Sequence, residues 1–134
     1  MDLNVFSINS AADDGVWIAL QDAEFKIARA QNPRFIAAFQ QRTKPYRAAL
    51  DMDLLDEGIA GPLWAGIFAD TVLLDWRGNV MLDGVALTYS RENAIKLLTD
   101  KRLKFMGWVR EQAAVLENTH AADAKEAVAT VAKN

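Results

Sequence analysis

The chain contains no cysteine, and this absence excludes several kinds of chemistry. Disulfide bridges, thiol catalysis and cysteine-ligated zinc or iron–sulfur centres all require that side chain. The chain also has a single histidine, His120, which excludes a histidine-based metal pair. Because His120 lies in an alanine-rich stretch, we interpret it as a bystander rather than as a member of a Ser–His–Asp triad.

Long hydrophobic runs and an excess of basic residues are missing too. The richest apolar stretch, GIAGPLWAGIFADTVLLDW, is broken by glycine, proline and aspartate before it approaches the ~20 residues of a membrane helix. The first residues, MDLNVFSINSAADDG, lack the basic-then-apolar order of a signal peptide. A net charge of −3 is not typical of a general nucleic-acid binder. We therefore expect a cytoplasmic protein with neither a membrane nor a nucleic-acid partner.

What is present predicts one globular domain over residues 1–117. With 134 residues the chain is long enough to bury a core of its own. We predict an α+β fold that is mostly helical, with a small N-terminal antiparallel sheet at about residues 3–28. Its expected strands are Leu3–Ile8, VWIAL (Val16–Leu20) and EFKIA (Glu24–Ala28), with DDG (Asp13–Gly15) as the turn between the first two.

A bundle of about five helices is predicted over residues 33–117. Asn32 is a good N-cap, Pro33 suits the first helical position, and Ser90 is a second N-cap. The expected helices run from Pro33 to before Pro45, over Tyr46–Glu57 with Leu50, Leu54 and Leu55 turned inward, over Pro62–Trp76, from Ser90 to about Leu98, and over Leu103–Leu116. Residues 118–134 are alanine-rich without an aromatic anchor, and we predict a flexible tail there.

Three stretches offer candidate chemistry, and each also has a structural interpretation that we favour. The carboxylates of DMDLLDE (Asp51, Asp53, Asp56 and Glu57) fit a magnesium site or an acid–base pair, or else the solvated face of an amphipathic helix. GIAGPLWAG has no lysine and no GK[ST] ending, which excludes a P-loop, and GIAG before Pro62 indicates instead that one helix stops and another starts. RTKPYR (Arg42–Arg47) fits a nucleic-acid contact, or else a solvated corner between two helices. We expect no enzymatic activity, no metal and no cofactor.

Residues 68–98, FADTVLLDWRGNVMLDGVALTYSRENAIKLL, resemble the recurring segment of tail assembly chaperones of long-tailed phages and prophages. In that family a helix ends in a "v.DW.g" element, which corresponds here to Val72, Asp75, Trp76 and Gly78. A "dG..l.yS.ena..lL" element follows, here Asp83, Gly84, Leu87, Tyr89, Ser90, Glu92, Asn93, Ala94, Leu97 and Leu98. A later helix with aromatic residues and an earlier "G.W" strand extend the resemblance to about residues 13–117.

The resemblance implies a non-enzymatic role in the cytoplasm of the bacterial host, outside the mature virion. Such chaperones bind the tape measure protein, keep its hydrophobic helices soluble and recruit tail tube subunits. They often self-associate, and a programmed −1 frameshift commonly produces a longer form. The ending Ala132–Asn134 is compatible with the slippery codons A AAA AAC, so a longer partner form would diverge there.

Six aromatic residues are the candidates for contact with a partner. Their side chains are large enough to anchor an interface if they are left exposed, and the alternative is that they belong to the core. They are Trp64, Phe68, Trp76, Tyr89, Phe105 and Trp108, of which Trp64 and Phe68 lie one helical turn apart. The alternative function is that of a structural phage component, either a head–tail completion or a minor tail protein. A small metal-dependent enzyme that uses Asp51–Glu57 is the third hypothesis.

Overall fold

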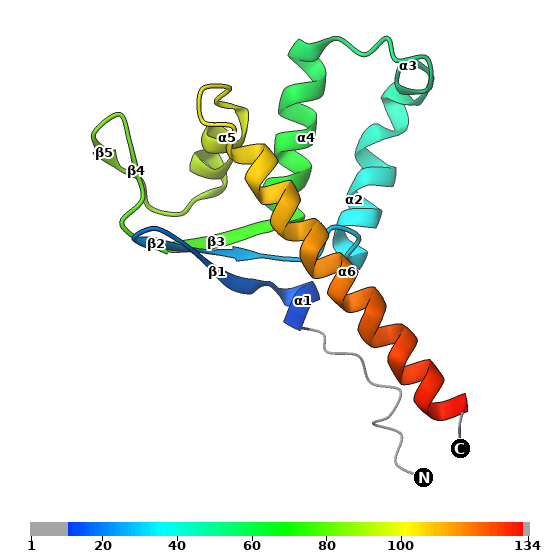
Figure 1. The fold of residues 1–134 in the computed structure, drawn as a ribbon. Coiled ribbons are helices and arrows are strands. Elements are labelled where there is room, and N and C mark those ends of the chain that lie inside the picture. The colour runs from blue at the N-terminus through cyan, green and yellow to red at the C-terminus, as the bar shows by residue number, and fades with distance from the viewer. Residues whose placement is uncertain (1–10, 133–134) are drawn as a thin grey trace.

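A computed structural model describes residues 11–132 and confirms an α+β fold that is mostly helical (Figure 1). Its side chains are described over residues 12–125. In chain order the elements are α1 (Ala11–Asp14), β1 (Val16–Leu20), β2 (Ala23–Ile27), α2 (Pro33–Thr43), a 3-10 turn (Lys44–Tyr46), α3 (Arg47–Asp51), α4 (Glu57–Thr71), β3 (Leu73–Gly78), β4 (Met81–Leu82), β5 (Val85–Ala86), α5 (Arg91–Thr99) and α6 (Phe105–Ala132).

The main sheet is antiparallel with the strand order β1-β2-β3. Ala23, Phe25 and Ile27 of β2 are buried while the residues between them are half-buried, as the alternation in the sequence predicts. β1 and β2 pair in an antiparallel sheet as predicted, but the predicted turn DDG is wrong, because Asp13 and Asp14 end α1. The predicted strand Leu3–Ile8 lies outside the described residues.

The third strand of this sheet comes from a segment that the sequence predicts as helix. α4 ends at Thr71, and Leu73–Gly78 pairs with β2, so the predicted helix Pro62–Trp76 is wrong at both ends. Lys26 pairs with Asp75 and Ile27 with Leu73, which leaves Leu74 as the extra residue of a β-bulge. The bulge turns both Leu73 and Trp76 toward the core. Because these buried residues are three apart, the sequence of the segment lacks the alternation with a period of two that indicates a strand.

The connection between α2 and α4 also differs from the prediction. Instead of one helix over Tyr46–Glu57, α3 stops at Asp51, and Asp53 adopts a positive φ of 55°. α4 then begins at Glu57, so that Pro62 lies inside it rather than at its start. The proline removes the hydrogen bond to the carbonyl of Gly58, which is exposed and can accept a bond from water instead.

α6 continues to Ala132, so the predicted flexible tail from residue 118 is helical in the structure. The loop after β2 holds this helix by two backbone donors: Ala30 N donates to the carbonyl of Ala113 (3.1 Å) and Gln31 N donates to Glu117 Oε1 (2.7 Å). Arg29 Nη1 also donates to both oxygens of the Glu117 carboxylate (3.1 and 3.2 Å). Beyond these contacts, the last turns of α6 project away from the other helices (Figure 1).

Asp70 joins three helices through its carboxylate. Arg91 of α5 donates to both oxygens (2.7 and 3.0 Å), and Arg42 of α2 lies 2.7 Å from Oδ2. The hydrogen bonds from Arg91, and then those from Arg42, hold the pKa of Asp70 below its ordinary value, although partial burial acts in the opposite direction. The ionised form of Asp70 is therefore the one that stabilises the packing of α2, α4 and α5.

We expect Asp70→Asn to lower the free energy of unfolding at pH 7 by about 1–2 kcal/mol. A carboxylate that binds two arginines stabilises a fold more than a single exposed ion pair does. A carboxylate with a lowered pKa stabilises the fold above its unfolded pKa, and this contribution is lost as pH falls through the folded pKa. Urea denaturation at pH 7, 5 and 3 should thus show the deficit shrinking only at the lowest pH. Asp51→Asn, at an exposed position, is the control. An equal deficit at pH 3 and pH 7 would show that ion pairing is not its cause.

Candidate functional site

The largest hollow that we describe is a groove of about 820 Å³ between α4, α5 and α6. We call it the α4–α6 groove. The loop from α3 to α4 forms one side, α4 and α5 contribute apolar side chains, and the first turns of α6 form the opposite side. Its lining residues are Leu50, Asp53, Leu55, Glu57, Gly58, Ala60, Gly61, Pro62, Trp64, Ile95, Leu98, Thr99, Lys101, Met106 and Arg110.

Large apolar side chains lie exposed in the α3–α4 loop and the first turn of α4, two segments that also supply lining residues of the groove. Met52 is 68% exposed, Leu54 69% and Ile59 42%, although Leu54 is predicted to point inward. The reason is the break after α3, because a continuous helix would have placed Leu54 on the face of Leu50. No residue of α3 is buried, so this loop carries apolar surface that the core does not use.

Trp64 marks the inner boundary of the groove. Its ring packs against Phe39 at 5.6 Å between centroids, and Arg110 of α6 lies 5.5 Å from the Trp64 centroid and 5.3 Å from that of Phe68. On the other side of this contact is a smaller hollow of about 180 Å³, lined in part by Phe35 and Ala113. The guanidinium of Arg110 thus covers the aromatic surface between the two hollows.

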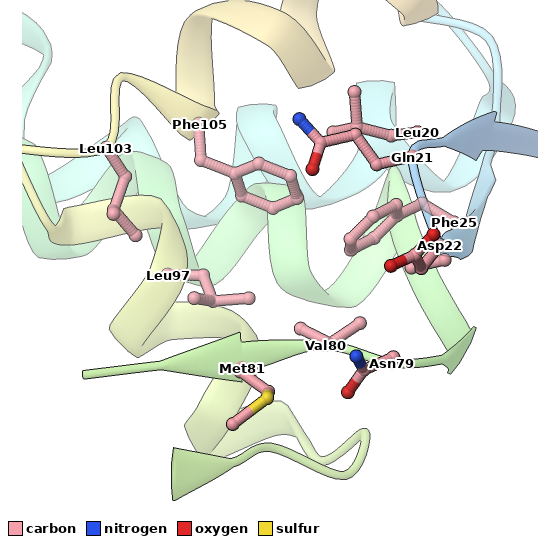
Figure 2. Close-up of a pocket in the computed structure, with 11 residues that line it drawn as sticks. Leu20, Gln21, Asp22, Phe25, Asn79, Val80, Met81, Leu97, Leu103 and Phe105 are labelled. Carbon is pink, nitrogen blue, oxygen red and sulfur yellow. The ribbon is translucent and has the colours of Figure 1, made fainter. Parts of the chain in front are cut away.

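A separate hollow of about 480 Å³ lies beside the β4–β5 hairpin (Figure 2). The side chains of Phe25, Val80, Leu97 and Phe105 point into it. Next to its lining residue Leu103, Arg102 Nη2 bridges Asp83 in the turn of the hairpin (3.1 Å) and Asp100 (2.8 Å). We call it the hairpin hollow.

Of the six predicted contact residues, Phe68 and Trp76 are buried and the other four are half-buried. Trp64 is half-buried at the groove, whereas Phe68 is 6% exposed and packs edge-on against Phe35 (5.8 Å). Trp76 is 5% exposed, and its indole nitrogen donates to the carbonyl of Leu87 (2.9 Å), with Tyr89 edge-on to its ring (5.2 Å).

Phe105 and Trp108, at the start of α6, stack on each other (5.7 Å) and are half-buried. Both contact Phe25, at 5.1 and 5.6 Å. Among the six, only Trp64 lines the α4–α6 groove, and only Phe105 lines the hairpin hollow. A role of these side chains in binding a partner stays a prediction.

The candidate chemical stretches are dispersed by the fold. Asp51, Asp53, Asp56 and Glu57 are exposed around the break between α3 and α4, not along one helix face. Within the described part of the chain, no three histidine, aspartate or glutamate side chains lie close enough to share a metal ion. In the basic stretch, Arg42 pairs with Asp70, while Lys44 at the start of the 3-10 turn and Arg47 just after it are exposed.

The comparisons with known proteins concern the same part of the chain. No helix within residues 11–132 has the length and apolar character needed to span a membrane. No curated protein and no solved structure matches the chain. The model of a family described as "YdaY prophage protein" matches residues 30–130, a range that contains every residue lining the α4–α6 groove. The chain therefore belongs to the YdaY prophage protein family.

Proposed function

We propose that this prophage protein is a tail assembly chaperone that holds an apolar helix of the tape measure protein and helps to recruit tail tube subunits. The observation that carries the proposal is the α4–α6 groove, which has apolar lining residues, together with the exposed side chains of Met52, Leu54 and Ile59 next to lining residues in the chain. Exposed apolar surface of this kind is typical of a protein–protein interface. The prophage family and the resemblance of residues 13–117 to tail assembly chaperones support the same function.

A helix suits this groove better than an extended peptide. The walls are themselves helices, and α4, with 15 residues, is about 22 Å long. An amphipathic helix that docks in such a groove buries apolar residues spaced three and four apart. The resemblance to tail assembly chaperones implies that the helices of the tape measure protein are hydrophobic and need such cover, which fits this mode of docking.

The proposal is tested by co-expression with the expected tape measure protein, the longest neighbouring reading frame, followed by pull-down and light scattering. We expect the chain to keep that partner soluble and to elute with it. The double variant Met52→Ser/Leu54→Ser should weaken the complex about tenfold or more, which corresponds to about 1.4 kcal/mol. Because both side chains are exposed, the variant should keep its unfolding midpoint.

A matched control removes equally exposed apolar side chains elsewhere. Met81 is 53% exposed and Val85 62%, both on the β4–β5 hairpin, so Met81→Ser/Val85→Ser should leave tape measure binding unchanged. If the partner is equally insoluble with and without the chain, the chaperone proposal is wrong. Recovery of the chain from purified virions would then favour the structural phage component.

A further inference from the structure

The two sides of the α4–α6 groove carry opposite charges. Asp53 and Glu57 lie on the side formed by the α3–α4 loop and the first turn of α4. Lys101, in the α5–α6 connection, and Arg110 of α6 lie on the other side. Over residues 12–125, none of these four side chains takes part in an ion pair.

Arg110 differs in this respect from the arginines that hold the fold together. Arg29, Arg42 and Arg91 are each paired with a carboxylate that joins two elements. Arg110 instead lies over the rings of Trp64 and Phe68, and these contacts keep its cation at the wall of the groove. No carboxylate within residues 12–125 neutralises its charge. A ligand carboxylate next to that wall would gain a charge-assisted hydrogen bond.

We infer that the groove accepts a partner helix in one direction only, with a basic flank toward Asp53 and Glu57 and an acidic flank toward Lys101 and Arg110. This inference rests on the proposed function. A helix whose apolar face enters the groove presents one flank to each side. Reversing its direction exchanges the flanks, so a helix with basic and acidic flanks meets opposite charges in one direction and like charges in the other. Charges arranged in this way determine the direction of a bound helix more than they raise its affinity.

The probes for this inference are synthetic amphipathic helices of about 18 residues, roughly 27 Å long. All share one leucine stripe. One peptide has lysine on one flank and glutamate on the other, a second has glutamate on both, and a third has lysine on both. We expect the mixed peptide to bind the full chain about tenfold more tightly than either uniform peptide at low salt. High salt should reduce that difference.

Direction is read from methionine methyl signals and a spin label on the peptide. Met106 lines the groove on the α6 side, Met52 precedes the lining residue Asp53 in the α3–α4 loop, and Met81 beside the hairpin hollow is an internal reference. If the mixed peptide binds in one direction, a label on its basic flank should broaden mainly the Met52 signal, and a label on its acidic flank mainly the Met106 signal. If it binds in both directions, the two labels should broaden the two signals in the same ratio.

Exchanging the charges of the groove should exchange the direction. In the variant Asp53→Lys/Glu57→Lys/Lys101→Glu/Arg110→Glu, the mixed peptide should still bind, with the two labelling patterns interchanged. Glu92→Lys/Lys96→Glu, an exposed pair on α5 outside the groove lining, is the matched control and should leave the patterns as they are. Binding of all three peptides with equal affinity and equal label patterns would overturn the direction inference alone. Failure of every peptide to bind would overturn groove binding itself.

Discussion

Trp76→Ala is expected to lower the free energy of unfolding by about 3–5 kcal/mol. Trp76 is 5% exposed, contacts Phe25 at 6.0 Å and receives the edge-on ring of Tyr89. Truncation would leave a cavity between β3 and the start of α5. It would also leave the carbonyl of Leu87 without the indole donor that now binds it. Most small domains have about 5–15 kcal/mol of stability in total, so the loss is large.

Denaturant unfolding followed by far-UV circular dichroism measures this change, since the chain has four tryptophans and their fluorescence would not report equally in each variant. Trp76→Phe keeps an aromatic ring but removes the donor, and should fall between wild type and Trp76→Ala. Trp17→Ala is the control, because Trp17 is half-buried in edge strand β1 beneath Arg77 (3.9 Å). Equal losses at positions 17 and 76 would contradict the assigned core role of Trp76.

Asn32→Ala is expected to cost about 2–4 kcal/mol, more than an ordinary N-cap. The side chain is fully buried, and its Oδ1 accepts from Phe35 N at 2.9 Å to cap α2. Its Nδ2 donates to two backbone carbonyls, Arg29 O (2.8 Å) and Thr71 O (2.9 Å). One amide therefore joins the loop after β2, the start of α2 and the end of α4. Alanine leaves all three backbone groups without this partner.

Asn32→Asp separates the cap from the other two bonds. Aspartate keeps the acceptor for Phe35 N but has no amide donor and places a charge beside two carbonyls, so we expect a loss at least as large as that of alanine. Ser90→Ala removes the cap of α5, where Ser90 accepts from Asn93 N at 3.0 Å, and should cost only about 1 kcal/mol. Wild-type stability of Asn32→Asp in urea would mean that capping is the whole role of Asn32.

The features that the sequence predicts correctly depend on neighbours along the chain. The caps Asn32 and Ser90 act on the amide three residues ahead, and the alternation of β2 follows from its own pleat. The segment Leu73–Gly78 could not be assigned in this way, because its bulge brings Leu73 and Trp76 to the same face with a helix-like spacing. The predicted start of α4 at Pro62 is wrong because the proline is tolerated inside the helix. The free-energy cost of the hydrogen bond that it removes is reduced because Gly58 is exposed and water can bind its carbonyl.

The candidate site was predicted only in part. Trp64 follows from the apolar composition of its helix, and it does border the groove. The exposure of Met52 and Leu54 depends on the interruption of the helix between α3 and α4, where Asp53 has a positive φ. The position of Arg110 over Trp64 depends on how α6 crosses the fold. Neither follows from local periodicity, because both are set by contacts between segments far apart in the chain.

The contacts of α6 also determine the order in which the protein can complete its core during synthesis. Phe25 leaves the ribosome early, but Phe105 and Trp108, which cover its ring, are translated about eighty residues later. Glu117, the partner of Arg29 88 positions away, follows later still. A nascent chain that has formed its sheet and α2–α5 therefore keeps an aromatic face open until α6 docks. An apolar face that is open during that interval is a surface through which nascent chains can aggregate.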